Sequence, residues 1–181
     1  MVKALLKSVF ICVLSAFVVI NSAKAASSGE EKMGDILQIF APAYALGMTM
    51  MEEDYEGTIQ YAEVFLSTQL ATEGLKALKL EERPNKADKR SFPSGHSSAS
   101  FSGAMFVHKR YGWKRALIPY ATSIATACIR VDVRAHYVHD TVAGAALAAL
   151  FTWVFTDKYV PKGVSVNADT KGISLGYKTT F

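Results

Sequence analysis

The chain has 181 residues, 50% of them hydrophobic, and 20 Lys and Arg against 16 Asp and Glu give a formal net charge of +4. This apolar content excludes an intrinsically disordered chain, and two cysteines are too few for a disulfide scaffold. A net charge this small is also atypical of a nucleic-acid-binding protein, so we expect no nucleic-acid partner.

The first 25 residues have the organisation of a secretory signal peptide. Lys3 and Lys7 precede twelve uncharged residues, 9–20, and the Ala-Lys-Ala sequence at 23–25 is typical of a cleavage site. Twelve helical residues cover about 18 Å of a hydrocarbon core about 30 Å thick, which disfavours an uncleaved anchor. We predict cleavage after Ala25 and export, which removes three lysines and no acid and leaves a charge of +1.

The remaining chain is predicted to be an all-α bundle. Residues 26–34 are small, polar and charged, so we expect a flexible leader before a domain at 35–158. Apolar residues recur at spacings of three and four, as in Ile59, Ala62 and Phe65, and Pro84 cannot lie inside the helix that they predict. About five helices are expected, over 36–51, 56–79, 95–109, 113–129 and 137–155.

A short C-terminal tail, 159–181, follows the predicted helices. Apolar and polar residues alternate at 164–166 and 173–175, which indicates a small β-hairpin. After signal cleavage Cys128 is the remaining cysteine, and we expect it to be a small core residue without a function of its own.

Three uncharged stretches bear on membrane insertion. They measure sixteen residues (36–51), fourteen (116–129) and sixteen (141–156), all shorter than the 18 or more typical of a spanning helix. Their lengths favour core helices of a soluble or peripherally attached protein. An integral membrane protein is the alternative.

Histidines mark two segments with the chemistry of an oxyanion site. Ser94 and Gly95 precede His96 in a turn before a predicted helix, where exposed N–H groups and hydroxyls suit phosphate, although such turns also cap many helices. His136 and Asp140 are spaced i, i+4, so the carboxylate can orient the imidazole or simply cap a helix.

Cationic side chains flank both segments. Arg130 lies six residues before His136, within reach of the same pocket, or else serves as a basic residue at a helix C-terminus. Lys76 and Arg83 are seven residues apart, so a continuous helix would place them on one side, about 10 Å apart along its axis.

Together these segments resemble the three-part signature of the type 2 phosphatidic acid phosphatase (PAP2) superfamily. The matching segments are Lys76-x6-Arg83-Pro84, Pro93-Ser94-Gly95-His96 and Arg130-x5-His136-x3-Asp140. The superfamily includes bacterial non-specific acid phosphatases, lipid phosphate phosphatases and vanadium haloperoxidases. The resemblance implies a helical phosphatase that needs no metal and no cofactor.

The resemblance also implies a role for each matching residue. His136 attacks phosphorus to form a phosphohistidine, Asp140 orients His136, and His96 protonates the leaving alcohol and later activates water. The non-bridging oxygens are held by Lys76, Arg83, Ser94, Gly95 and Arg130.

Two features depart from the family pattern. Ile129 stands where a serine usually precedes the arginine of the third motif, so one hydroxyl contact to phosphate is missing. The gap between Pro84 and Pro93 is eight residues, which leaves little room for a lid.

Two other classes are weighed against this interpretation. His139-Asp140 is an HD dipeptide of the kind found in metal-dependent phosphohydrolases, but His96, Asp157 and Asp169 lack the context of further ligands. A non-catalytic phosphate-binding bundle is disfavoured because all three motifs are complete.

The substrate depends on location. We predict an exported, periplasmic phosphatase that hydrolyses soluble phosphate esters. The alternative is an integral enzyme of the cytoplasmic membrane, with its active site facing outward, that acts on a lipid phosphate or an isoprenoid diphosphate. Lys86, Lys89 and Arg90 could steer anionic head groups in either setting, or form a solvated basic loop.

Overall fold

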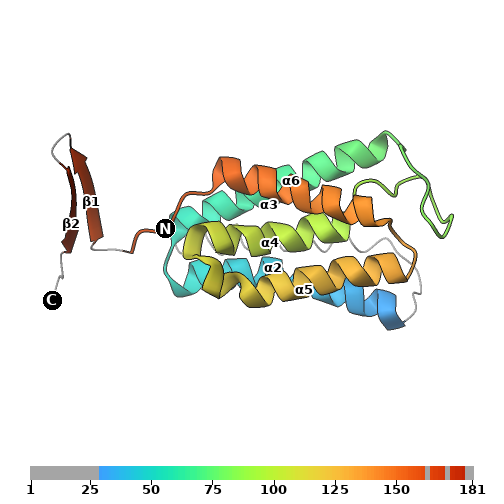
Figure 1. Ribbon diagram of the computed structural model, residues 1–181, viewed down its shortest axis with the longest axis horizontal. Helices are drawn as coiled ribbons and strands as arrows, with labels where there is room; N and C mark the ends of the chain where they lie inside the picture. The colour runs from blue at the N-terminus through green and yellow to red at the C-terminus, as the bar shows by residue number, and fades with distance from the viewer. Residues whose placement is uncertain (1–28, 162–163, 170–171, 178–181) are drawn as a thin grey trace.

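The computed structural model describes residues 29–161, 164–169 and 172–177; side chains are described as far as residue 161. Five helices lie along a common long axis (Figure 1). They are α2 (Gly29–Met51), α3 (Tyr55–Ala77), α4 (Gly95–Tyr111), α5 (Trp113–Asp132) and α6 (Val138–Phe155). The all-α helical bundle expected from the sequence is confirmed, while the predicted signal peptide lies outside the described residues.

Helix α2 begins earlier than predicted. Residues 29–34, expected to belong to a flexible leader, form its first turns. Glu30 and Glu31 lie in the first turn, where negative charge favours the positive end of the helix dipole. Gly34 is buried so close to α5 that a β-carbon there would lie 3.1 Å from Ile129. Packing against α5 therefore extends a helix that composition alone did not indicate.

Helix α5 buries a narrow face. Its buried residues recur at spacings of three and four. They are Ala116, Pro119, Ser123, Thr126 and Arg130. Cys128 lies off this face and is exposed, so its predicted core position is wrong.

Helix α4 is the central helix of the bundle and brings many hydroxyl groups into the interior. Ser97, Ser98, Ser100 and Ser102 are all buried on it. The hydroxyl of Ser100 donates to Ser123 on α5 at 2.8 Å. Hydroxyl-to-hydroxyl bonds thus link neighbouring helices, alongside a smaller apolar cluster around Tyr61, Phe65 and Phe106.

The predicted hairpin is present beyond α6. Strands β1 (Val164–Asp169) and β2 (Gly172–Tyr177) pair antiparallel, with Val166 opposite Leu175. Figure 1 shows this hairpin extending away from the bundle, next to the end at which α6 finishes.

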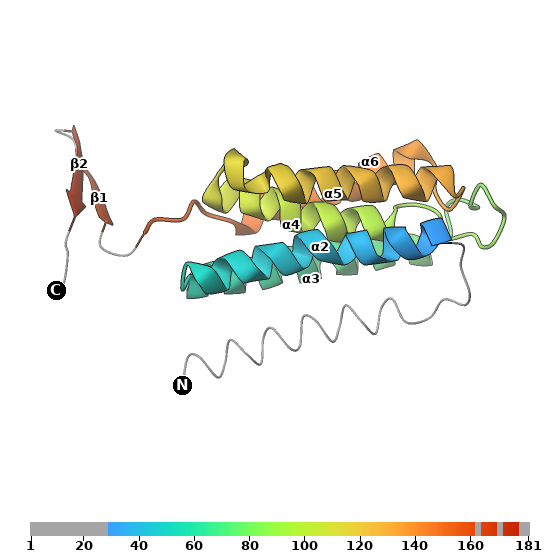
Figure 2. The same ribbon diagram turned by 90° about the horizontal axis from the view of Figure 1, so that it is seen from below.

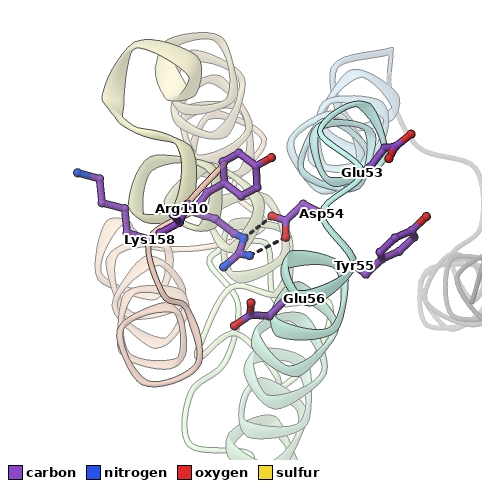
Figure 3. A pocket seen from close by; sticks show the side chains of 8 residues that line it. Glu53, Asp54, Tyr55, Glu56, Arg110 and Lys158 are labelled. Carbon is purple, nitrogen blue, oxygen red and sulfur yellow. Dashed lines mark hydrogen bonds and ion pairs between the residues drawn. The ribbon is translucent and has the colours of Figure 1, made fainter. Parts of the chain in front are cut away.

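One end of the bundle is closed by a buried ion pair (Figure 3). Asp54, between α2 and α3, accepts two bonds from Arg110 at the end of α4, at 2.5 and 2.6 Å. Arg110 also donates to the carbonyl of Asp157 beyond α6, at 3.0 Å. Because Asp54 and Arg110 pair with each other across elements, this ion pair serves to join helices.

The opposite end carries the sequence motifs. Figures 1 and 2 show the start of α2, the α3–α4 loop and the α5–α6 connection gathered at this end of the bundle. The residues predicted to act on phosphate come from the latter two connections and the helix turns beside them. The helices therefore separate the predicted site from the Asp54–Arg110 pair by the full length of the bundle.

Close packing of α6 on the start of α4 requires Gly144. A β-carbon at Gly144 would lie 2.6 Å from the carbonyl oxygen of Ser94 and 2.9 Å from the amide nitrogen of Ser98. We expect Gly144→Ala to cost about 1–3 kcal/mol of stability through overpacking. The measurement is the thermal unfolding midpoint of the purified protein.

Gly47→Ala is the matched control, because no atom lies within 4 Å of a β-carbon at this helical glycine. It should leave the midpoint unchanged or raise it, since alanine favours helix by about 1 kcal/mol over glycine. Equal effects of the two substitutions would contradict the close packing at Gly144.

Candidate active site

The carboxylate of Asp140 organises one end of the bundle. Asp140 lies in the first turn of α6 and is completely buried. Its Oδ2 accepts hydrogen bonds from the hydroxyl of Ser91 at 2.5 Å and from the backbone N–H of Tyr137 at 2.9 Å. The backbone N–H of Ser94 donates to the carbonyl of Asp140 at 3.0 Å. One residue thus joins the loop before α4 to the start of α6.

His136 lies beside this carboxylate and just before α6. The sequence spacing suggested that His136 and Asp140 share a helical face, but His136 precedes the helix that contains Asp140. Its Nδ1 is 3.4 Å from Oδ2 of Asp140, and its backbone N–H donates to the carbonyl of Arg130 at 3.0 Å. Because Nδ1 faces the carboxylate, Nε2 lies on the opposite side of the ring. Nε2 makes no hydrogen bond with the residues that the structure describes.

The environment of His136 holds the ring in its neutral form. Only 2% of the residue is exposed, and burial is the largest cause that lowers its pKa, to about 3. The hydrogen bond to Asp140 acts in the opposite direction, while the charges of Lys76, Arg83 and Arg130 lower the pKa further. Three cations from separate parts of the chain therefore act on one imidazole.

Lys76 and Arg83 reach the site by a different path from the one expected. Helix α3 ends at Ala77, so no continuous helix connects the two residues. Lys76 is buried in the last turn and donates to the carbonyl of Arg90 at 3.1 Å. Arg83, in the loop, pairs with Asp88 at 2.7 Å and donates to the carbonyl of Ala135 at 3.3 Å, directly before His136.

The second motif forms the N-terminus of α4. Ser94 is the N-cap, with its hydroxyl accepting from the N–H of Ser97 at 3.4 Å. A β-carbon at Gly95 would lie 3.6 Å from Cε of Lys76, which places this helix start beside the lysine. The geometry brings Ser94, Gly95 and Lys76 together, and the first turn of α4 offers backbone N–H groups to an anion.

His96 has a partner that the sequence did not indicate. Its Nε2 lies 2.6 Å from Oδ1 of Asp35 on α2. The same carboxylate oxygen is 3.7 Å from a terminal nitrogen of Arg130 on α5. The first turns of α2 were predicted to be a leader, and no motif includes Asp35, so only the packing of α2 against α5 identifies this contact.

Three buried polar atoms at this end lack hydrogen-bond partners among the described residues. They are Nε of Arg130, the hydroxyl oxygen of Ser97 and Oδ1 of Asp140. Buried polar groups are nearly always hydrogen-bonded in folded proteins, so two unsatisfied donors, one in the third motif and one directly after the second, are consistent with a place for a ligand.

Ile129 occupies the position where the family pattern has serine. Its side chain contacts Gly34 on α2. This residue therefore contributes packing between α2 and α5, and the hydroxyl that a serine would offer is absent.

A cluster of candidate metal ligands lies next to the site. Glu81, His139 and Asp140 each offer a ligand atom, and the three atoms lie within 4.8 Å of one another. Nε2 of the exposed His139 already pairs with Glu81 at 2.7 Å. Asp157, a candidate ligand for an HD-type site, lies beyond the far end of α6 and bonds to Gln60. Asp157 therefore does not join His139 and Asp140, as a further ligand of an HD-type site would.

Comparisons with known proteins identify the family of the chain. Residues 40–162 match the sequence profile of the PAP2 superfamily. The lipid A 4'-phosphatase of Helicobacter pylori is 33% identical over 159 residues, which cover 80% of each chain.

Two solved structures share the fold. One is the first transmembrane PAP2-type phosphatidylglycerolphosphate phosphatase from Bacillus subtilis, with a TM-score of 0.54 and 20% identity over 83% of this chain and 93% of the other. The other is Aquifex aeolicus LpxE, with a TM-score of 0.51 and 17% identity over 78% of this chain and 92% of the other. From the sequence match and the curated relative, this chain belongs to the PAP2 superfamily.

Proposed function

We propose that this protein is an integral membrane phosphatase that removes phosphate from a lipid head group without a metal ion. The observation that carries this proposal is the position of the charged cluster at one end of a bundle whose sides are apolar. His136, Lys76, Arg83 and Arg130 gather at that end. A lipid in the adjacent leaflet could present its phosphate to them.

The chemistry that we assign uses the two histidines in the roles implied by the family resemblance. Nε2 of His136 attacks phosphorus while the bond from phosphorus to the ester oxygen breaks, giving a phosphohistidine. His96 donates a proton to the departing alcohol, then takes a proton from water as the water attacks phosphorus. Inorganic phosphate leaves and His136 is regenerated. Asp140 holds the opposite nitrogen of His136 throughout.

Phosphoryl transfer depends chiefly on positive charge around the non-bridging oxygens. We assign that role to Lys76, Arg83 and Arg130, together with the helix start at Ser94 and Gly95. These groups supply the charge that a magnesium ion provides in other phosphotransferases. No serine hydroxyl is available at position 129, so more of the binding energy falls to the arginine beside it.

The surface of the bundle supports a membrane setting. Side chains such as Leu70 on α3, Ile118 on α5 and Trp153 on α6 are largely exposed, whereas serines and threonines are buried inside. Such a distribution is unfavourable in water, because large apolar side chains would remain hydrated, and it suits a lipid environment.

Helix lengths also favour the membrane alternative over the soluble enzyme preferred from sequence. Counting only uncharged residues underestimated the helices, since α2 and α3 each have 23 residues and extend about 34 Å. Within the described chain, α6 is the one helix long and apolar enough by composition to span a bilayer, and only 28% of that segment is buried. Its remaining surface is available to lipid.

We propose a phosphorylated membrane lipid as the substrate, with the phosphomonoester of lipid A as the first candidate. The support is the 33% identity to a lipid A 4'-phosphatase over 80% of both chains. The catalytic domain is assigned to residues 35–158, with the active site facing outward from the cytoplasmic membrane.

The assigned nucleophile can be tested directly. Replacing His136 by alanine should lower kcat for a phosphomonoester by about 10³-fold or more, because no phosphohistidine can form. Wild-type activity should persist in EDTA and be inhibited by vanadate. Cys128→Ser, at an exposed position on α5, is the control and should retain full activity. Loss of activity in EDTA would instead favour metal-dependent chemistry. An active His136→Ala enzyme would show that His136 is not the nucleophile.

The setting and the substrate class form a second prediction. The full chain should stay with the membrane pellet after alkaline carbonate washing, because its apolar faces contact lipid. In detergent micelles, kcat/KM should be higher for lipid A phosphate than for glycerol phosphate. Release of the protein into the wash, together with a preference for glycerol phosphate, would support a soluble enzyme instead. Retention in the membrane with a preference for an isoprenoid diphosphate would support a membrane enzyme with that substrate in place of lipid A.

The neutral state of His136 predicts a dependence of stability on pH. The pKa is lowered to about 3 in the folded protein against about 6.5 when unfolded. Between these values the unfolded chain binds a proton that the native site does not, so the free energy of unfolding falls as pH falls. The unfolding midpoint of wild type should therefore drop more between pH 7 and pH 4.5 than that of His136→Asn. Parallel curves would contradict the neutral, buried imidazole.

A further inference from the structure

The carboxylate of Asp35 makes a contact that no sequence motif contains. Asp35 lies near the start of α2, three residues before the buried Gln38, at the end of the bundle that carries the site. Its Oδ1 is 2.6 Å from Nε2 of His96 and 3.7 Å from Arg130. A helix outside the motifs thus supplies a charge directly to one of the two histidines.

The two histidines need opposite protonation states. The nucleophile must be neutral, and burial together with three nearby cations lowers the pKa of His136 to about 3. The residue that protonates the leaving alcohol must instead carry a proton before the reaction begins. Because the cationic surroundings that suit His136 oppose protonation of a neighbouring imidazole, His96 needs a negative partner.

Asp35 is the carboxylate placed to serve His96. Charged groups at this end include Lys76 on α3, Arg83 in the loop, Arg130 on α5 and Asp140 on α6. Helix α2 adds two carboxylates that act on Arg130, those of Asp35 and Glu31. Oδ2 of Asp140 is already bound by Ser91, Tyr137 and His136. Among these carboxylates, that of Asp35 contacts His96, at 2.6 Å.

The exposure of Asp35 indicates that its contact with His96 contributes little to folding. Its side chain is 48% exposed, whereas that of His96 is 11% exposed. Ion pairs with so much solvent contact contribute little to folding, about 0–1 kcal/mol. A variant that lacks the carboxylate is therefore expected to fold, and its effect on the reaction can be measured.

We propose that Asp35 is a positioning residue that keeps His96 protonated and oriented to donate to the leaving group. Asp35 holds Nε2–H, and the proton passes from Nδ1 to the alcohol oxygen as the bond from phosphorus to oxygen breaks. This inference rests on the proposed phosphatase function. It makes the two histidines a complementary pair, with Asp140 holding Nδ1 of the nucleophile and Asp35 holding Nε2 of the acid.

The test compares leaving groups in Asp35→Asn, which keeps the shape of the side chain and removes its charge. An alkyl phosphate has a poor leaving group that needs a proton, whereas the nitrophenolate of p-nitrophenyl phosphate leaves without one. The measured constant is kcat/KM, which reports only the steps through formation of the phosphohistidine and excludes the later attack of water. Against wild type, kcat/KM for the alkyl phosphate should fall about tenfold or more, part of the 10²-fold to 10⁴-fold typical of general acid catalysis. For p-nitrophenyl phosphate, kcat/KM should change less than about threefold. The basic limb of the alkyl phosphate pH profile should also move to lower pH.

Glu30→Gln is the matched control, since it removes one negative charge from an exposed position in the first turn of the same helix. It should leave both substrates and the pH profile unchanged. His96→Asn should show the same selective loss for the alkyl phosphate, to a larger extent. An equal loss for both substrates in Asp35→Asn, or no loss for either, would overturn the positioning role.

A lower KM with an unchanged or higher kcat would also overturn the proposal, because it would mean that Asp35 competes with phosphate for Arg130. Failure of the underlying function would look different. In that case wild type would hydrolyse neither substrate, or His136→Ala would retain wild-type activity. Either result would contradict both the proposed function and the role of Asp35.

Discussion

The bonds made by Asp140 are the interaction on which the site depends. A single buried carboxylate accepts from Ser91, from the first N–H before α6 and from the ring of His136. Its backbone carbonyl also receives the N–H of Ser94. The loop that carries Arg83 and the helix start that carries His96 are thus held against the histidine by one residue. Removing the carboxylate would break the bonds to Ser91 in the loop and to Tyr137 and His136 before α6, whereas the backbone bond to Ser94 would remain.

Around this residue the protein gathers like charges that repel one another. Lys76, Arg83 and Arg130 all act on His136, and each is buried. Backbone carbonyls and Asp88 satisfy part of their hydrogen-bonding capacity, but Nε of Arg130 has no partner among the described residues. An anion would offset the repulsion among these three cations.

The rest of the bundle supports this end through an inverted distribution of side chains. Hydroxyl groups on α4 bond across to α3 and α5, as in the pairs Thr72–Ser98 and Ser100–Ser123. Large apolar residues occupy the outer faces. The far end is closed by the Asp54–Arg110 pair, so the helices are held at both ends and present an apolar surface between them. This division suits a protein whose sides meet lipid and whose catalytic end meets water.

The sequence by itself determined the helices and the three motifs, because apolar periodicity and residue spacing are local properties. It therefore predicted His96, His136 and Asp140 and the cations that converge near them. It did not determine the start of α2, the exposed position of Cys128 or the contact between Asp35 and His96. These depend on how α2 packs against α5, where Gly34 admits Ile129 and brings Asp35 to the site. Only tertiary structure decided which face of each helix is inside, since in this bundle many polar residues share the interior with the apolar cluster while large apolar side chains lie outside, so apolar pattern alone does not identify the buried face.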